Sequence, residues 1–201
     1  MKRQSEGFLK HMGHYKAMVI GVSAGGFKAL SEVLPHLQRT VPLPVFIVQH
    51  LSPVSDTYFA SHLQNHCLVT VKVAEDKEPA EPGVVYLAPP DYHLLIEADN
   101  SLALSLENRV NYSRPSIDVL FNSAAEVYQG GLIGVVMTGA NADGAKGLAR
   151  IKEYGGLTIV QAPETAEVDT MPLAALEAVD VDYIVPLDRL GMFLNTLAMG
   201  Q

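Results

Sequence analysis

The sequence predicts an α/β protein with a doubly wound, mostly parallel sheet and an antiparallel hairpin insert. Short, continuous apolar runs alternate with amphipathic helical segments along most of the 201 residues, which is typical of strands buried on both faces of a parallel sheet. The rhythm breaks at Pro79, Pro82 and Gly83, and three short strand-like runs follow, with Asp99 and Asn100 at a turn between the last two. These observations favour βαβ units around one antiparallel insert.

The elements before the break follow from the spacing of apolar residues. Each expected strand is a short apolar run, and each expected helix carries apolar residues three and four positions apart. The expected order is a strand at 17–21, a helix at 26–38, a strand at 45–48, a helix at 56–66 with Ser55 or Asp56 as its N-cap, and a strand at 69–73.

After the break we expect the antiparallel insert and then a return of the βαβ rhythm. The three short strands of the insert are expected at 84–88, 93–97 and 102–106. The remaining elements are expected as helices at 116–128, 142–154, 171–178 and 187–199, and as strands at 132–138, 157–161 and 182–185. A glycine pair, Gly155 and Gly156, ends the second of these helices.

Composition excludes several classes of protein. The net charge of −8 argues against a nucleic-acid or anionic-membrane partner, and no apolar run is long enough to insert into a membrane. The single cysteine, Cys67, excludes an intrachain disulfide framework and a cysteine-based zinc site. His62 and His66 have a spacing that permits metal binding, but no third ligand is evident, so we expect no metal.

Residues 1–16 differ from the remainder of the chain because they are basic and lack the apolar stretch of a signal peptide. We interpret them as a flexible tail or an expression remnant, and residues 17–201 as one domain. With one cysteine and no targeting signal, a cytoplasmic location is expected.

Polar residues follow three of the predicted strands, at the edge where ligands bind in doubly wound sheets. Ser23 lies in the glycine-rich turn after the first strand, beside the N-terminus of a helix. Such a turn exposes a hydroxyl next to backbone N–H groups, as a nucleophile requires. The same turn is compatible with a phosphate-binding loop or with a serine that only caps the helix.

His50 and Asp143 follow two other strands. His50 would lie at the same edge as Ser23 if the first two strands are neighbours, and its imidazole could accept the serine proton. Asp143 could orient that imidazole. Taken alone, His50 could equally be a structural histidine and Asp143 an ordinary N-cap, but the three together predict a Ser–His–Asp site.

Other motifs account for these residues less well. Gly21, Ser23 and Gly25 satisfy the G-x-S-x-G pattern, but α/β-hydrolases have the order serine, aspartate, histidine. The glycine-rich turn lacks the second glycine of a dinucleotide fingerprint, and the sequence has no G-x-x-x-x-G-K-[ST] loop.

Five ordered segments resemble the catalytic domain of chemotaxis protein-glutamate methylesterases, the CheB family. The resemblance runs from about residue 17 to 199, nearly the whole domain, and these five segments carry it. In order they are Gly21-Val-Ser-Ala-Gly-Gly26, Val48-Gln-His50, Ala88-Pro-Pro-Asp-Tyr-His93, Arg114-Pro-Ser-Ile-Asp-Val-Leu-Phe121 and Thr138-Gly-Ala-Asn-Ala-Asp-Gly144.

The resemblance implies a serine esterase that hydrolyses glutamate γ-methyl esters on the cytoplasmic helices of methyl-accepting chemotaxis receptors, releasing methanol. Many members also deamidate receptor glutamines. By position, Ser23 would be the nucleophile, His50 the general base and Asp143 its orienting partner, with no cofactor. Two other functions stay open: a non-catalytic esterase-like binding module, and a hydrolase of another ester or amide.

The surroundings of the expected site depart from the family pattern. Ala24 stands where the family usually has threonine, and Ala140 lies in a segment where the family typically reads Gly-Met-Gly-Asn-Asp-Gly. We expect oxyanion or substrate contacts from Ala24, Gly25, Gly26, Ala140 and Arg114. Residues 1–16 are too short for the family's usual receiver domain, so regulation by a separate domain or protein is expected.

Overall fold

The computed structural model describes residues 15–50 and 58–200. Nine strands and six α-helices lie within these ranges, in an order close to the predicted one. The strands are β1 (Ala17–Val22), β2 (Val45–Gln49), β3 (Thr70–Val73), β4 (Val84–Leu87), β5 (His93–Ile96), β6 (Leu102–Ser105), β7 (Leu132–Val136), β8 (Leu157–Gln161) and β9 (Tyr183–Val185). The helices are α2 (Gly26–Val33), α3 (Tyr58–His66), α4 (Ile117–Tyr128), α5 (Ala145–Glu153), α6 (Thr170–Ala178) and α7 (Leu187–Met199).

Three short 3₁₀ turns join these elements, at Leu34–His36, Gln129–Gly131 and Pro163–Thr165. The first of them replaces the end of the helix predicted at 26–38, because Pro35 cannot donate the backbone hydrogen bond that would continue an α-helix. The N-cap predicted at Ser55 or Asp56 lies outside the described residues. No helix of the described ranges is long and apolar enough to cross a membrane.

Seven strands form one parallel sheet in the order β3-β4-β2-β1-β7-β8-β9, and β5 pairs with β6 in a separate antiparallel hairpin. The predicted fold class is therefore confirmed. One part of the prediction is wrong: β4, which we expected in the antiparallel insert, pairs in parallel with β2 and β3. Its short apolar run suits either location, and the pairing depends on contacts with strands distant in sequence.

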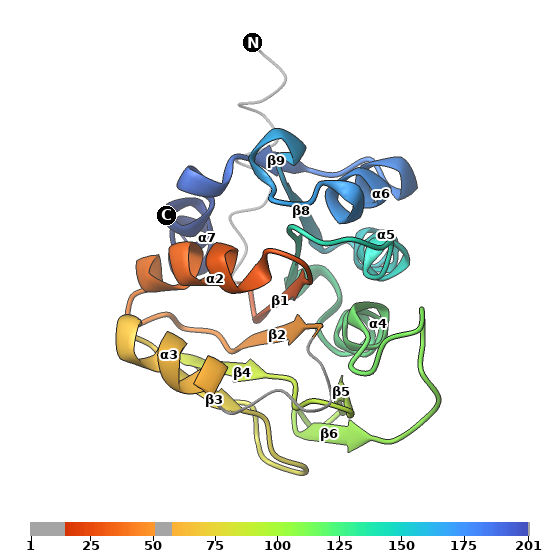
Figure 1. Cartoon of the computed structure of the whole chain (residues 1–201). Helices are drawn as coiled ribbons and strands as arrows, with labels where there is room; N and C mark the ends of the chain where they lie inside the picture. Colours follow the sequence, from red (N-terminus) through yellow and green to blue (C-terminus); the bar gives the residue numbers. More distant parts are fainter. Residues whose placement is uncertain (1–14, 51–57, 201) are drawn as a thin grey trace.

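Two apolar cores cover the two faces of the sheet. Side chains of β1 alternate between them, with Met18 and Ile20 in one core and Ala17 and Val19 in the other. Helices α2, α3 and α7 cover the first face, whereas α4, α5, α6 and the hairpin cover the second (Figure 1). Both faces of the central strands are buried, which explains the continuous apolar runs in the sequence.

Two glycines let the start of α4 approach the sheet closely. A Cβ added at Gly21 would lie 2.4 Å from the side chain of Ile117, and one added at Gly144 would lie 2.7 Å from it. Ile117 is the first residue of α4. Close packing at these two positions therefore brings the N-terminus of α4 to the carboxyl edge of β1 and β7.

Candidate active site

The carboxyl ends of three adjacent strands define the candidate site. β1 pairs with β2 on one side and with β7 on the other, with Val22 opposite Gln49 and Gly21 opposite Val136. The segments that follow these strands therefore start at the same edge of the sheet. They carry Ser23, His50 and Asp143, as the sequence predicted.

Hydrogen bonds join these three side chains in series. His50 Nδ1 lies 3.2 Å from Ser23 Oγ, and His50 Nε2 lies 2.8 Å from Asp143 Oδ2. The side chain of His50 is 12% exposed and that of Asp143 is fully buried. The series thus runs from the half-buried hydroxyl of Ser23 inward to a carboxylate shielded from water.

The orientation of the imidazole determines which nitrogen can act as a base. An ionised Asp143 accepts a hydrogen bond, so the proton of neutral His50 resides on Nε2. The lone pair of Nδ1 then faces Ser23 Oγ. In this tautomer His50 can accept the proton of the serine hydroxyl.

The turn after β1 holds the backbone of Ser23 without using its side chain as a cap. Its N–H donates to the carbonyl of Thr138 over 2.9 Å, and its carbonyl accepts from Gln49 Nε2 over 2.9 Å. The N-cap of α2 is Gly25, with φ of 77°, and no side-chain hydrogen bond caps this helix. The interpretation of Ser23 as a simple helix cap is therefore wrong.

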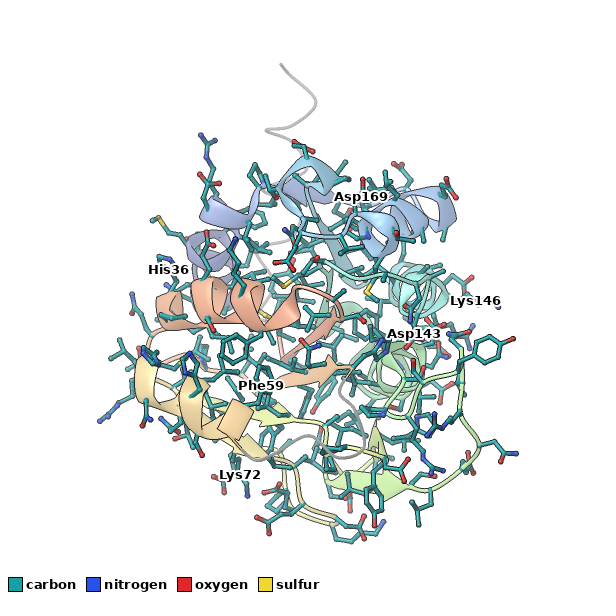
Figure 2. All side chains as sticks on the ribbon, viewed as in Figure 1. His36, Phe59, Lys72, Asp143, Lys146 and Asp169 are labelled. Atoms are coloured by element: carbon teal, nitrogen blue, oxygen red, sulfur yellow. The ribbon has the colours of Figure 1, made fainter. Side chains whose placement is uncertain are left out.

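Asp143 accepts hydrogen bonds from five donors. The four besides His50 are Nδ2 of Asn111 at 2.7 Å, Oγ of Ser116 at 2.9 Å and the N–H groups of Ile117 at 2.7 Å and Asp118 at 3.2 Å. The two N–H groups belong to the first turn of α4, where the helix dipole favours a negative charge. Figure 2 shows Asp143 between α4 and α5. Asp143 therefore stabilises the start of α4, whereas our alternative interpretation placed it as the cap of α5.

Asp118 makes the reciprocal interaction. This residue of the first turn of α4 accepts hydrogen bonds at Oδ1 from the N–H groups of Gly144 and Gly147, at 3.0 and 2.7 Å, at the start of α5. Asn111 Nδ2 lies 2.8 Å from Asp118 Oδ2 as well as close to Asp143. Asp143, which precedes α5, thus binds the N-terminus of α4, and Asp118 of α4 binds the N-terminus of α5. The side-chain amide of Asn111 donates to both carboxylates.

The two carboxyl groups have pKa values shifted in opposite directions. Burial alone would raise the pKa of Asp143, but hydrogen bonds from His50, Asn111 and the N–H of Ile117 outweigh it and lower this pKa. Burial raises the pKa of Asp118, and the negative charge of Asp143 adds to the rise. Asp143 is therefore the carboxyl group that the surroundings keep ionised, as an orienting partner of His50 requires.

The lowered pKa of Asp143 predicts that the stability of the fold depends on acidity. A carboxyl group with a depressed pKa stabilises the fold above its unfolded value of about 3.9 and loses this contribution as the pH falls through the folded value. We expect the free energy of unfolding of the wild type to exceed that of Asp143→Asn at pH 6, and the difference to shrink below about pH 4. Denaturant unfolding at pH 6 and pH 3 measures it. An equal difference at both pH values would contradict the prediction.

The predicted oxyanion residues have different environments. Among the described residues, no acceptor lies within hydrogen-bond distance of the N–H groups of Ala24 and Ala140, next to Ser23 and Asn141 respectively. The N–H of Gly26 donates to the carbonyl of Ser23 and is occupied within the turn. A Cβ added at Gly26 would lie 2.0 Å from Oε1 of Gln49, so glycine allows that buried amide to approach.

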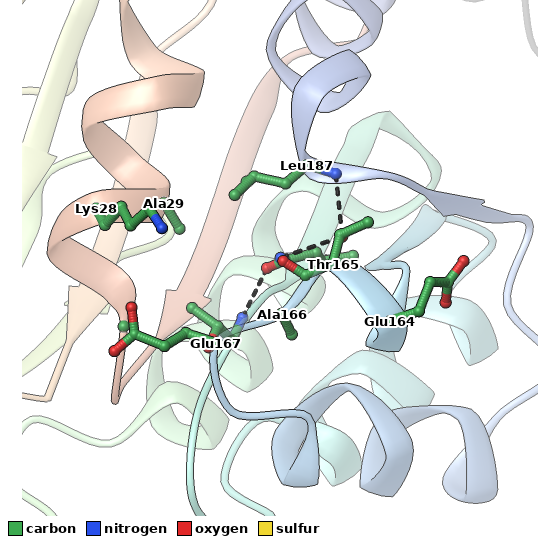
Figure 3. Close-up of a pocket in the computed structure, with 10 residues that line it drawn as sticks. Lys28, Ala29, Glu164, Thr165, Ala166, Glu167 and Leu187 are labelled. Carbon is green, nitrogen blue, oxygen red and sulfur yellow. Dashed lines mark hydrogen bonds between the residues drawn. The ribbon is translucent and has the colours of Figure 1, made fainter.

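Gly25 likewise allows a close approach, in this case of the side chain of Glu167. A Cβ at this position would lie 2.7 Å from Cβ of Glu167, and its positive φ disfavours other residues. Beside it lies a pocket of about 250 Å³, lined in part by Lys28, Glu164 and Glu167, at the same edge of the sheet (Figure 3). Gln161 and Thr165 also line this pocket, and Gln161 Nε2 donates to the carbonyl of Thr165.

The guanidinium of Arg114 connects two loops. It donates from Nε and Nη2 to Asp91 Oδ1, at 3.2 and 3.0 Å, and from Nη1 to the carbonyls of Leu106 and Glu107. These contacts use donors that we expected to meet a substrate. A substrate contact of Arg114 stays a prediction, whereas its role in holding the two loops together is visible in the structure.

Three residues around Asp143 escaped the sequence prediction as members of the site: Asn111, Ser116 and Asp118. The signal available for the last two was their place at the start of a predicted helix, where serine and aspartate are common for purely local reasons. Buried His93 supports Ser116, because its Nδ1 accepts the N–H of Ser116 over 3.2 Å while its Nε2 lies 3.1 Å from the carbonyl of Asn108.

A hydroxyl, an imidazole and a buried carboxylate in hydrogen-bonded series are the arrangement of serine hydrolases. The site at the carboxyl edge of the doubly wound sheet therefore has the arrangement of a serine hydrolase. Comparison with known proteins specifies the family: the CheB methylesterase family matches residues 18–194, and the chain belongs to this family.

Individual relatives agree with this assignment. A protein of Leptospira interrogans, "Putative protein-glutamate methylesterase/protein-glutamine glutaminase", is 52% identical over 177 residues, which are 88% of this chain and 92% of that protein. A protein of Thermotoga maritima, "Protein-glutamate methylesterase/protein-glutamine glutaminase", is 38% identical over 174 residues, which are 85% of this chain and 51% of that protein.

A solved structure shares the fold. The crystal structure of the Thermotoga maritima CheB methylesterase catalytic domain matches with a TM-score of 0.88 and 37% sequence identity. The match covers 91% of this chain and 98% of that one. The described fold is therefore that of a CheB catalytic domain.

Proposed function

We propose that this chain is a protein-glutamate methylesterase that hydrolyses glutamate γ-methyl esters of methyl-accepting chemotaxis receptors in the cytoplasm, and that it also deamidates receptor glutamines. The observation that carries the proposal is the hydrogen-bonded series Ser23, His50 and Asp143. The names of the relatives support both activities on protein glutamate and glutamine residues, and the receptor as substrate is what the resemblance to the CheB family implies. Regulation by a separate domain or protein stays a prediction.

In the first half of the reaction, Ser23 Oγ attacks the ester carbonyl while Nδ1 of His50 removes the hydroxyl proton. The imidazolium that forms is stabilised by the ionised Asp143 at Nε2. When the tetrahedral intermediate collapses, the bond to the methoxy oxygen breaks, and His50 returns its proton to that oxygen. Methanol leaves, and the glutamate side chain remains bound to Ser23 as an acyl ester.

In the second half, water takes the place of the serine hydroxyl as nucleophile. His50 removes a proton from the attacking water and then returns it to Ser23 Oγ as the acyl bond breaks. The products are a glutamate side chain and the free enzyme. With a glutamine substrate the same steps release ammonia in place of methanol, because the leaving nitrogen receives the proton.

Negative charge that develops on the carbonyl oxygen needs hydrogen-bond donors nearby. The N–H groups of Ala24 and Ala140 suit this role, because Ala24 follows Ser23, Ala140 lies three residues before Asp143, and neither N–H meets an acceptor within the described ranges. The N–H groups of Ser23 and Gly26 are already used inside the turn. We therefore propose Ala24 and Ala140 as the oxyanion donors.

The experiment that tests the proposed function measures products from defined substrates. We expect methanol from a methylated receptor fragment, ammonia from its glutamine form, and covalent labelling of Ser23 by a fluorophosphonate. Labelling together with hydrolysis of simple esters, but without methanol release, would favour a hydrolase of another ester or amide. Absence of both labelling and release from the folded protein would favour a non-catalytic binding module.

A further inference from the structure

A tight turn lies at the rim of the candidate site, between β6 and α4. The N–H of Val110 donates to the carbonyl of Ser113 over 3.1 Å, and the N–H of Ser113 donates to the carbonyl of Val110 over 2.9 Å. The two residues between them, Asn111 and Tyr112, have φ values of 51° and 63°. Two positive φ values inside such a reciprocal pair are the pattern of a type I′ turn, which favours Asn at the first position and Gly at the second.

Tyr112 is therefore unexpected at its position. A bulky side chain at positive φ is sterically disfavoured, whereas Asn111 tolerates this conformation. The side chain of Tyr112 is 96% exposed and recovers almost nothing by burial. Hydrogen bonds from Asn111 Nδ2 to Asp118 and Asp143 hold the turn in this conformation. Strained backbone conformations cluster at functional sites, and this one presents an exposed aromatic ring on the turn that holds the carboxylate of Asp143.

Other exposed apolar side chains lie close to Tyr112 in the sequence. A further one lies on the loop of Asp91, which Arg114 joins to the segment after β6. We use the term rim surface for Tyr92, Leu106, Arg109, Val110 and Tyr112. The four apolar members are all more than one third exposed, and Arg109 is half exposed, 3.8 Å from Asp91. Figure 1 shows the segment between β6 and α4 arching outward before it returns to α4.

The rim surface combines features that suit a polypeptide substrate. Exposed aromatic residues supply a large contact area with few rotatable bonds. Their side chains therefore lose little conformational entropy on binding. Arg109 and Arg114 balance the charges of Asp91 and Glu107 in this part of a chain whose net charge is −8. A segment rich in glutamates would therefore meet less repulsion here than from the acidic chain as a whole, which favours docking in one place.

We propose that the rim surface, with Tyr112 at its tip, docks the receptor segment that carries the reacting glutamate side chain. This inference rests on the proposed function and extends it to the recognition of the polypeptide around the ester. Asn111 and Tyr112 then have separate roles in one turn. Asn111 points inward and holds Asp143, and Tyr112 points outward and meets the substrate.

Replacement of Tyr112 by glycine separates recognition from folding. Glycine adopts positive φ freely, so the melting temperature of Tyr112→Gly is expected to equal or exceed that of the wild type. We expect the ratio of kcat/KM for a methylated receptor fragment to kcat/KM for a small ester to fall at least tenfold, because only the receptor reaches the rim. Tyr112→Phe keeps the ring and is expected to retain a ratio near that of the wild type.

The matched control is Met192→Ala. Met192 is 64% exposed on α7, which packs on the opposite face of the sheet from α4, and its loss is expected to leave the ratio unchanged. A ratio for Tyr112→Gly within twofold of the wild type would overturn the docking role and leave the methylesterase activity in place. If the wild type hydrolyses the small ester but releases no methanol from the receptor, the proposed function and the docking role both fail.

The alternative occupant of the rim surface is a second copy of the chain. Sedimentation of the wild type over a range of concentrations tests this directly. We expect no dimer that depends on Tyr112. A dimer that is present in the wild type and lost in Tyr112→Gly would assign the surface to self-association and overturn the proposal.

Discussion

Replacement of Ser23 by alanine is expected to lower methanol release from a methylated receptor by roughly 10³- to 10⁶-fold. The reason is that in the proposed mechanism the hydroxyl forms the covalent bond to the substrate, and no other described hydroxyl lies within hydrogen-bond distance of His50. The fold should persist, because the hydrogen bond to His50 is the only one that the Ser23 hydroxyl makes with the described residues, and the backbone hydrogen bonds of Ser23 remain.

Methanol release, with fluorophosphonate labelling beside it, measures this effect. The control is Ser31→Ala on α2, where the only hydrogen bond of the hydroxyl to the described part of the chain is the one that it donates to the carbonyl of Phe27. We expect Ser31→Ala to retain wild-type turnover and labelling. Residual turnover of Ser23→Ala within tenfold of the wild type, from a preparation free of wild-type enzyme, would exclude Ser23 as the nucleophile.

Replacement of Asp143 by alanine is expected to reduce both activity and stability. Five donors lose this acceptor at once, and the two N–H groups at the start of α4 and the hydroxyl of Ser116 are buried there, whereas Asn111 Nδ2 keeps its contact with Asp118. We expect a loss on the order of 3 kcal/mol in the free energy of unfolding and a fall in kcat of roughly 10³- to 10⁴-fold.

Asp143→Asn keeps the shape of the side chain and one acceptor oxygen, so its cost in stability is expected to be smaller than that of Asp143→Ala. Its activity is expected to stay low. An amide NH₂ that faces His50 requires the unprotonated Nε2, so the imidazole proton moves to Nδ1, the nitrogen that faces Ser23. His50 then cannot accept the serine proton.

A partly buried carboxylate with several hydrogen-bond donors provides a control that distinguishes catalysis from folding. Asp182 accepts hydrogen bonds from Lys152 and from the N–H and hydroxyl of Thr158, at the opposite edge of the sheet. We expect Asp182→Ala to lose stability and to retain kcat at temperatures where it is folded. Denaturant unfolding and turnover should be measured on the same samples. A kcat of Asp143→Asn equal to that of the wild type would contradict the orienting role.

The sequence predicted those residues of the site whose position follows from the end of a single strand. Apolar runs located β1, β2 and β7, and Ser23, His50 and Asp143 follow them within a few residues. Doubly wound sheets gather such positions at one edge, so their approach followed from the fold class. The wrong placement of β4 did not disturb this result, because β4 lies on the far side of β2 from β1.

The unpredicted parts depend on how elements distant in sequence pack together. Asn111 and Asp118 meet Asp143 only because α4 packs against α5 with its N-terminus beside the end of β7. Local sequence explains Asp118 equally well as an ordinary residue of a helix start. The positive φ of Asn111, which directs its amide toward the carboxylates, likewise has no signal in the sequence around it.

The reciprocal exchange of carboxylates between α4 and α5 bears on how the protein fails when heated. A catalytic aspartate on a free loop can swing away while the remainder of the molecule stays intact. Here the carboxylate is also a structural ligand of the neighbouring helix, and Asp118 returns the interaction. Displacement of Asp143 from His50 therefore requires the two helices to separate, so we expect the geometry of the proposed catalytic site to be lost together with the cooperative melting of the domain.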